Sequence, residues 1–288
     1  MARNLDIDLL RTFVAIAESH TLGRAAATIG RTQAAVSMQV QKLEELVSQP
    51  LLNRTGRGVT LTLHGERLLV HARSILRSHD EALAQISGAG LSGTIRFGCP
   101  DDYAAAFLPH LLRGFAVRHP QVFVEVLCAP TPRLLDRVKS HALDLALIST
   151  SLPGDGRPLA RVIRQEPLVW VGKPGDNALQ MAPLQLALTD PDALDYQAAC
   201  SALDTARVPY RIAYASGSLS GLTAVVRSGQ AIAVLTRAAV PADLQILPPS
   251  ATLPELPSVG LTLKFDLARP PAVVREFAAE MEAMLPNL

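Results

Sequence analysis

The first sixty residues contain three short segments with helical spacing and then a glycine-rich strand pair, and this order most constrains the fold. Each segment places apolar side chains on one helical face; these are Leu10, Phe13, Val14 and Ala17, then Leu22, Ala25, Ala26 and Ile29, then Val36, Val40, Leu43 and Val47. Thr21 and Thr32 are placed to cap the second and third helices, and Gly30 to end the second. The pattern predicts a trihelical module within residues 7 to 62.

The outward face of the third helix is small, rich in amides and lightly basic. Stepping about 100° per residue puts Ala34, Ser37, Met38, Gln41 and Lys42 opposite the buried face. Glutamine can pair with adenine and alanine can contact a thymine methyl. Residues 1–60 carry seven Lys or Arg against five Asp or Glu in a chain of formal net charge +1. This small basic excess permits DNA binding without requiring it.

The segment LLNRTGRGVTLT follows the third helix. Two short apolar runs flank a glycine-punctuated turn with Arg54 and Arg57, which is typical of a wing that contacts phosphates. The alternative is a trihelical module with a merely solvated turn. The order of the elements and the basic turn favour a winged helix-turn-helix over residues 1–62. Its predicted DNA-binding residues are Thr32, Gln33, Ala34, Ser37, Gln41, Lys42, Arg54 and Arg57.

Residues 63 to about 86 contain no proline, and Gly65 is their only glycine. Apolar or neutral side chains recur in steps of four and three, with leucines every seven residues, which favours one long helix with a pairing seam. The seam is Leu68, Ala72, Ile75, His79, Ala82 and Ile86, flanked by Leu69, Leu76 and Leu83. The helix could instead pack only on its own domain. His71 and His79 are interpreted as surface or seam-edge residues rather than metal ligands.

The stretch SGAGLSG, residues 87–93, is the clearest domain boundary. Beyond it, strand-like apolar runs alternate with helical ones, including a helix from Pro132 to about Leu143. This alternation predicts an α/β fold with parallel strands. We expect a linker helix and hinge over residues 63–92 and two α/β lobes over 93–288. The first lobe takes about 93–164 and 268–288, and the second about 165–267; the last strand and helix return to the first lobe.

Residues 5–69 resemble the start of LysR-type transcriptional regulators almost position for position. Ala34 and Ala35 replace a proline that many members carry, and Met38 stands where arginine or glutamine is common, so we expect an apolar contact or none there. LSGTIRFGCPDDYAAAFLPHLLRGFAVRHPQVFVEV and VPYRIAYASGSLSGLTAVVRSGQAIAVL resemble the effector-binding half. The resemblance implies a periplasmic-binding-protein-like cleft, a small-molecule effector, a dyad-symmetric site on double-stranded DNA, and a homodimer, or a tetramer, formed through antiparallel linker helices.

In open α/β sheets, ligands bind beyond the carboxyl ends of strands, beside helix N-termini. The effector residues predicted on this basis are Cys99, Pro100, Asp101, Asp102, Ser149, Thr150, Thr189, Ser216 and Gly217. Asp101 and Asp102 would occupy a helix N-terminus and repel a carboxylate. Either one caps the helix and the other is solvated, or the cleft prefers a neutral or amine-bearing ligand.

Other functions have less support in the sequence. No GxSxG, HExxH, GxxxxGK or GxGxxG motif occurs, so no enzyme is indicated. A transport-type binding protein would explain the second half of the chain, but it would need a signal peptide and would not require the N-terminal module. A thiol-redox-sensing regulator would use Cys99 or Cys200, neither of which has an evident cationic neighbour. The three scattered cysteines imply no disulfide framework or metal site, and no cofactor is expected. A cytoplasmic protein without a membrane segment is predicted.

Overall fold

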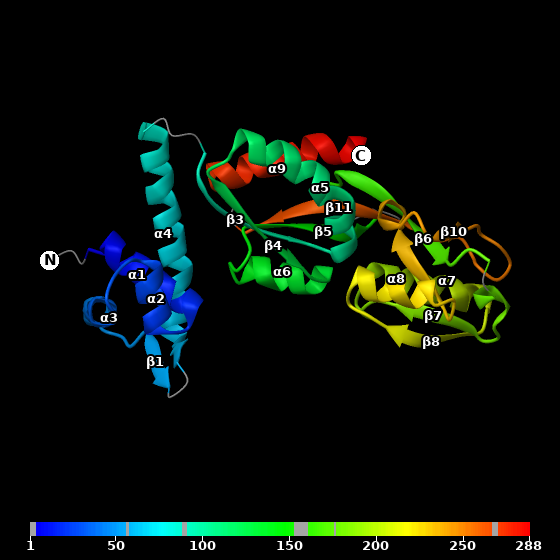
Figure 1. Cartoon of the computed structure of the whole chain (residues 1–288), viewed down its shortest axis with the longest axis horizontal. Helices are drawn as coiled ribbons and strands as arrows, with labels where there is room; N and C mark the ends of the chain where they lie inside the picture. The colour runs from blue at the N-terminus through cyan, green and yellow to red at the C-terminus, as the bar shows by residue number, and fades with distance from the viewer. Residues whose placement is uncertain (1–3, 56–57, 88–90, 153–160, 176, 267–269) are drawn as a thin grey trace. The chain divides into compact units, whose positions relative to one another are not determined.

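The computed structural model describes residues 4–55, 58–87, 91–152, 161–175, 177–266 and 270–288 (Figure 1). The chain forms two compact units, residues 1–93 and 94–288, and each is described by itself. Arg57, part of the predicted hinge and the predicted lobe boundary at 268 lie outside the described residues.

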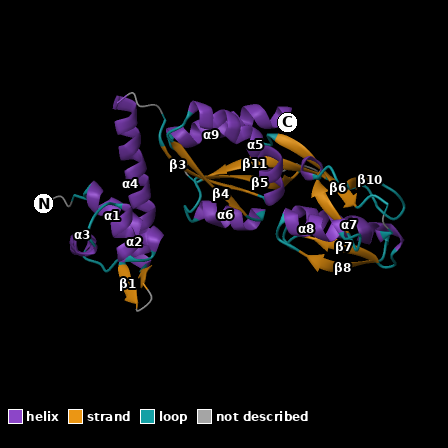
Figure 2. Ribbon diagram, viewed as in Figure 1, coloured by secondary structure: helices purple, strands orange, loops and turns teal. Residues whose placement is uncertain are grey.

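In its described residues, the first unit, here called the head, contains four helices and a two-stranded sheet (Figure 2). Its elements are α1 (Ile7–Ser19), α2 (Leu22–Thr28), α3 (Gln33–Val47), β1 (Leu52–Thr55), β2 (Gly58–Leu61) and α4 (Leu63–Ser87). The predicted caps are confirmed, because the hydroxyl of Thr21 accepts the Arg24 N–H at 3.3 Å and that of Thr32 accepts the Ala35 N–H at 3.2 Å. Such caps contribute about 1 kcal/mol each.

Apolar faces of the three short helices form the core of the head. Leu10, Phe13 and Leu43 are fully buried in it, as the helical spacing predicted. One prediction was incomplete, because Ile16 is also buried whereas Ala17 is only half-buried. Each fully buried side chain of this size contributes about 1.5–3 kcal/mol.

Strands β1 and β2 form an antiparallel hairpin that pairs Leu52 with Leu61 and Thr55 with Gly58. The Val59 N–H donates to the carbonyl of His20, the residue that ends α1, at 2.8 Å. Gly58 has a φ of 142°, and a Cβ there would lie 2.7 Å from the same carbonyl oxygen. A glycine is therefore required where the hairpin meets α1.

The long helix α4 is partly built into the head. The hydroxyl of Thr62 accepts the Gly65 N–H at 3.0 Å and caps its first turn. Ala72 and Leu76 are buried against the α1 core, and Arg73 pairs with Glu18 at 3.2 Å. Near the other end, Leu83 and Ile86 are 56% and 86% exposed. One stretch of α4 therefore packs on its own domain, as one of the two alternatives predicted, and the other stretch carries exposed apolar side chains.

The second unit contains a mixed sheet in the order β4-β3-β5-β11-β6-β9-β7-β8, with β10 paired to β6 (Figures 1 and 2). Its strands are β3 (Gly93–Cys99), β4 (Val122–Cys128), β5 (Leu145–Ser151), β6 (Arg164–Gly172), β7 (Leu184–Leu188), β8 (Tyr210–Ala215), β9 (Ile232–Thr236), β10 (Gln245–Leu247) and β11 (Ser258–Phe265). Its helices are α5 (Asp101–Arg118), α6 (Thr131–Lys139), α7 (Leu194–Ala206), α8 (Leu219–Arg227) and α9 (Ala272–Met284), with short 3-10 turns at Ala178–Gln180, Arg237–Ala239 and Leu285–Asn287.

Parallel pairs occur on both sides of the antiparallel strands β11 and β6, which gives the two lobes. Strand β11 pairs with β5 of the first lobe from Val259 to Phe265. The chain therefore returns to the first lobe earlier than the predicted boundary at residue 268. The helix predicted to reach Leu143 instead ends at Lys139, because His141 adopts a positive φ of 57° and turns the chain. Leu143 is buried just before β5.

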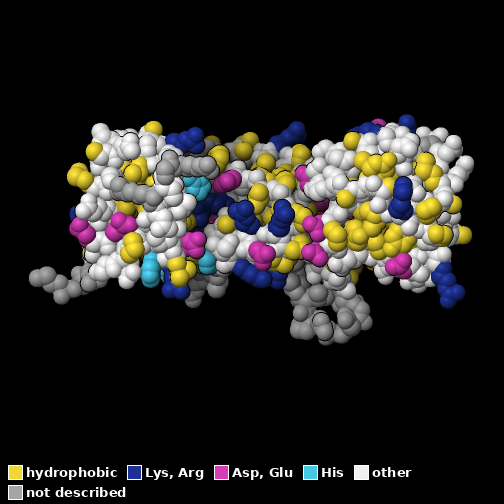
Figure 3. Space-filling view, turned by 90° about the horizontal axis from the view of Figure 1, so that it is seen from below, with side chains coloured by type: hydrophobic (Ala, Val, Ile, Leu, Met, Phe, Trp, Pro, Cys, Tyr) yellow, Lys and Arg dark blue, Asp and Glu magenta, His cyan; other side chains and the backbone are white. Residues whose placement is uncertain are grey.

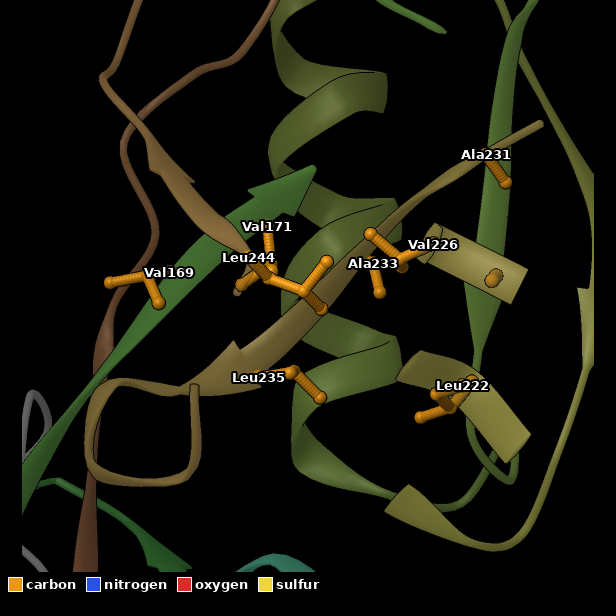
Figure 4. Close-up of a cluster of buried hydrophobic side chains, with 9 residues drawn as sticks. Val169, Val171, Leu222, Val226, Ala231, Ala233, Leu235 and Leu244 are labelled. Atoms are coloured by element: carbon orange, nitrogen blue, oxygen red, sulfur yellow. The ribbon is translucent and has the colours of Figure 1, made fainter. Parts of the chain in front are cut away.

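Each lobe has its own core. In the first, Phe277 of α9 packs edge-on against Phe97 and Phe115, with ring centroids 5.5 and 4.9 Å apart. In the second, side chains from β6, β9 and α8 meet between the sheet and the helix (Figure 4). They include Val171, Leu222 and Val226, all buried. These two cores hold the strand ends that form the candidate site below.

No helix within the described residues is both long and apolar enough to cross a membrane. On the face drawn in Figure 3, Lys and Arg side chains are interspersed with Asp and Glu rather than gathered into one field. This agrees with the near-neutral formal charge of the chain.

Candidate functional sites

The first candidate site is the outward face of α3, a nucleic-acid interface by its sequence pattern. The residues predicted there lie on or next to this helix: Thr32, Gln33, Ala34, Gln41 and Lys42 are exposed, and Ser37 is half-buried. Met38 is 66% exposed in the middle of this face. The structure therefore places five of the eight predicted DNA-binding residues on α3 and a sixth, Thr32, at its N-cap. Arg54 lies in β1 without a described side chain, and Arg57 lies outside the described residues.

Two carboxylates of α3 make hydrogen bonds, one to the hairpin and one on the exposed side of the helix. Glu44 accepts the N–H groups of Leu51 and Leu52 at 2.7 and 3.2 Å, which ties the first strand of the hairpin to α3. On the exposed side, the amide of Gln41 donates to Glu45 at 3.3 Å. Lys42 is the basic residue of this face, and the glutamine amides are its main hydrogen-bonding groups.

The second candidate site is a cavity of about 210 Å³ between the lobes of the second unit. This is below the roughly 300–1,000 Å³ of pockets for drug-sized ligands, so it suits a smaller molecule. Its walls are Pro100, Asp101, Asp102, Tyr103, Cys128, Ala129, Pro130, Thr131, Ser149, Leu168, Thr189, Ala193, Leu194, Asp195, Gly217, Ser218, Leu219, Leu222, Leu235, Thr236 and Val259.

Six of the nine predicted effector residues line this cavity: Pro100, Asp101, Asp102, Ser149, Thr189 and Gly217. The other three are not lining residues. Cys99 is 1% exposed behind the wall. Thr150 follows Ser149 on β5, where successive side chains point to opposite faces. The hydroxyl of Ser216 is turned onto the Ser218 backbone, with both hydrogen bonds at 3.3 Å.

Sequence reasoning missed several polar residues of the wall: Tyr103, Cys128, Thr131, Asp195 and Thr236. Asp195 lies in the first turn of α7. The start of that helix near residue 193 was visible in the sequence, so its first turn was the available signal. Tyr103 and Ser149 share a 2.7 Å hydrogen bond that joins α5 to β5.

Two aspartates of α5 connect the lobes. Asp101 accepts the N–H of Leu219, the first residue of α8, at 2.7 Å. Asp102 accepts the hydroxyl of Thr236, at the end of β9, at 2.8 Å. Asp195 accepts the hydroxyl of Thr189 at 2.8 Å within the second lobe. The prediction that one of these two neighbouring aspartates is only solvated is therefore wrong, because both accept a hydrogen bond from the second lobe.

Burial dominates the electrostatics of this cavity. Desolvation raises the pKa of Asp102 to about 7, although its hydrogen bond from Thr236 acts in the opposite direction. Desolvation also raises the pKa of Asp195, again against the hydrogen bond from Thr189. With Asp101, three carboxyl groups face the cavity, and none of its lining residues within the described chain is Lys, Arg or His. A cationic group is the charge that these walls would stabilise.

Comparison with protein families gives two matches that together cover nearly the whole chain. Residues 7–66 match the bacterial regulatory helix-turn-helix protein, lysR family, and residues 88–285 match the LysR substrate binding domain.

Two curated regulators are similar along most of their length. The HTH-type transcriptional regulator DgdR of Burkholderia cepacia is 59% identical over 288 residues, covering 100% of this chain and 97% of that protein. PecT of Dickeya dadantii (strain 3937) is 33% identical over 254 residues, covering 88% and 79%. The crystal structure of ArgP from Mycobacterium tuberculosis superposes with a TM-score of 0.70 at 17% identity, covering 99% of both chains, which supports the fold.

Proposed function

Because the chain belongs to the LysR family of DNA-binding transcriptional regulators, we propose that it reads a dyad-symmetric operator with α3 and responds to a small amine-bearing effector. Thr32, Gln33, Ala34 and Ser37 meet base edges near the start of α3, where recognition helices usually contact bases. Gln41 and Lys42 extend this contact, and Arg54 and Arg57 bind phosphates. The exposure of the α3 face supports this assignment.

A dyad-symmetric operator requires two heads, and we propose that α4 pairs them. The exposed apolar side chains Ile75 and Ile86 fall on the predicted seam, and Leu83 falls on its flank. Leu83 and Ile86 also lie beyond the part of α4 that its own head buries. Apolar surface of this kind is stabilised when a second copy covers it. The regulator acts on DNA in the cytoplasm, and we expect no catalytic activity.

The effector proposal rests on one observation, the three carboxyl groups in a cavity whose described walls hold no basic side chain. An ammonium group would satisfy Asp102 and Asp195 and remove the cost of burying their charge. The hydroxyls of Thr131, Ser149 and Ser218 then offer donors to the remainder of the ligand. A purely anionic effector would face repulsion from all three aspartates.

Capture of fragments from the source genome by the full chain tests the DNA assignment. We expect enrichment of a fragment with an inverted repeat, and the genes beside it would narrow the choice of effector. Equal recovery of unrelated fragments would contradict specific recognition.

A calorimetric screen of small amines and matched carboxylic acids against the full-length protein tests the effector class. We expect binding only from amines, with affinity that rises as the pH passes through about 7, because an ammonium group prefers ionised Asp102. Binding should also release protons to the buffer. If Asp101→Asn and Asp102→Asn both leave affinity unchanged, or if acids bind and amines do not, the amine proposal is wrong.

A further inference from the structure

Two cysteines far apart in the sequence lie side by side behind and within the cavity wall. Cys99 ends β3 and Cys128 ends β4, and these strands are neighbours in the sheet. The N–H of Ala129 donates to the carbonyl of Cys99 at 3.2 Å, which aligns the two strand ends. The two thiols interact, because each shifts the pKa of the other.

The strand pairing permits a disulfide. Adjacent strands lie about 4.8 Å apart in general, which is within the roughly 4.4–6.8 Å that separates the Cα atoms of bonded cysteines. We propose that Cys99 and Cys128 form a two-thiol redox site that closes to a disulfide on reaction with a hydroperoxide. The sequence had suggested Cys99 or Cys200 acting alone, whereas the structure supplies Cys128 as the partner of Cys99.

The two thiols differ in environment, and this assigns their roles. Cys128 is exposed and lines the cavity, while Cys99 is buried. The hydrogen bond from the Cys99 thiol lowers the pKa of Cys128 to about 7, and the same bond together with burial raises the pKa of Cys99. Cys128 is therefore the accessible thiolate that attacks, and Cys99 is the thiol that resolves.

The chemistry balances with hydrogen peroxide as oxidant. The Cys128 thiolate attacks one peroxide oxygen, the O–O bond breaks, hydroxide leaves, and a sulfenic acid forms. The sulfur of Cys99 then attacks the sulfenic sulfur, the S–O bond breaks, and the proton of the Cys99 thiol leaves with the oxygen as water. The proton that Cys128 releases on ionisation converts the hydroxide to water. Counted from the two thiols, the protein therefore loses two electrons and two protons, and the peroxide is reduced to two molecules of water.

This reaction would alter the effector cavity directly, because Cys128 forms part of its wall. A disulfide withdraws the Cys128 sulfur toward β3 and removes its thiolate from the site. Oxidation is thus expected to change effector affinity, a consequence that rests on the proposed effector function. The disulfide itself does not depend on that function, so its formation is measured separately.

Peroxide treatment of the full-length protein, followed by mass analysis of its peptides under non-reducing conditions, tests the proposal. Wild type and the matched control Cys200→Ser are expected to lose two hydrogens and to yield one peptide pair joined through Cys99 and Cys128. Cys128→Ser and Cys99→Ser should yield none, with circular dichroism checking that each variant folds. A disulfide that contains Cys200, or direct overoxidation of Cys128 in the wild type, would overturn it.

The rate of Cys128 alkylation supplies a second readout. A pKa near 7 rather than the ordinary 9 gives about 50-fold more thiolate at pH 7, offset by a roughly eightfold loss of intrinsic nucleophilicity. We therefore expect Cys128 to react about sixfold faster in Cys200→Ser than in Cys99→Ala, which removes the hydrogen-bond donor, with a midpoint near pH 7 only in the former. Equal rates and equal midpoints in both variants would show that Cys99 does not activate Cys128.

Discussion

The carboxylate of Asp101 on the first lobe accepts the backbone N–H of Leu219 on the second lobe at 2.7 Å. This bond joins the first turns of α5 and α8, and the acceptor also interacts favourably with the positive end of α8. The acidic pair that the sequence marked as unusual is therefore a connection between lobes as well as part of the cavity wall.

Removal of this connection should weaken the second unit. Hydrogen bonds to charged groups contribute about 1.5–3 kcal/mol, so Asp101→Ala is expected to lower the free energy of unfolding by that amount. Asp101→Asn keeps an acceptor and should lose less. Urea unfolding checks both, with Asp136→Ala at an exposed position on α6 as the control. A loss in Asp101→Ala no larger than in the control would contradict the role of this bond.

The stability of the protein should depend on pH through Asp102. Burial raises the pKa of this carboxyl to about 7 from 3.8, so between these values the folded chain keeps a proton that the unfolded chain releases. The contribution of Asp102 to the free energy of unfolding therefore falls as the pH rises from about 4 to 7, by as much as about 4 kcal/mol. This contribution is largest at the acidic end of that window.

Asp102→Asn, which can still accept from Thr236, should flatten this pH dependence. Unfolding of the wild type, Asp102→Asn and the exposed Asp136→Asn, measured across the same pH range, provides the comparison. Parallel curves for all three proteins would show that Asp102 does not carry this effect.

Much of the head was predictable because its determinants are local. Helical spacing and the two threonine caps act within a few residues, and the structure contains each of them. The cavity was predictable in part, since strand ends give candidates without giving the order of strands. The contact of Cys99 with Cys128 depends on β4 lying beside β3, a pairing between distant segments that neither segment encodes alone.

The hairpin of the head should be intolerant of a side chain at Gly58. Gly58→Ala adds a Cβ 2.7 Å from the His20 carbonyl at a φ of 142°, so we expect a loss of more than about 2 kcal/mol in head stability and weaker DNA binding. Gly30→Ala is the matched control, because its φ is also positive at 64° but its Cβ would meet nothing within 4 Å. It should cost about 1 kcal/mol. Equal thermal shifts in the two variants would argue against a steric role for the hairpin contact.

Met38 is expected to contribute little to operator recognition despite its central, exposed place on α3. Met38→Ala should reduce specific binding by less than Gln33→Ala, for which a loss of about 1–3 kcal/mol is expected from one base contact. Fluorescence anisotropy with operator and random DNA separates specific from non-specific binding. A loss above about 3 kcal/mol for Met38→Ala would assign it a larger role than a good polar base contact.

The exposed end of α4 should control assembly. Leu83→Glu puts a charge on the proposed pairing surface of both copies, and losing two buried leucines costs more than about 3 kcal/mol, or over 100-fold in dimer dissociation constant. Leu63→Glu, at the other end of the same helix and 62% exposed, should leave assembly unchanged. Sedimentation velocity measures both. Dissociation by the Leu63 variant alone would place the pairing surface elsewhere.

The burial of Ala72 and Leu76 in the core of the head has a mechanical consequence. Since α4 cannot swivel without opening that core, the helix and α3 turn together as one rigid lever. The 25 residues of α4 make an arm of about 37 Å. A tilt of about 5° at its far end therefore displaces the head by about 3 Å, close to the 3.4 Å rise of one base pair. In the proposed pair of α4 helices, a change of a few degrees is enough to move a head by one step along the DNA.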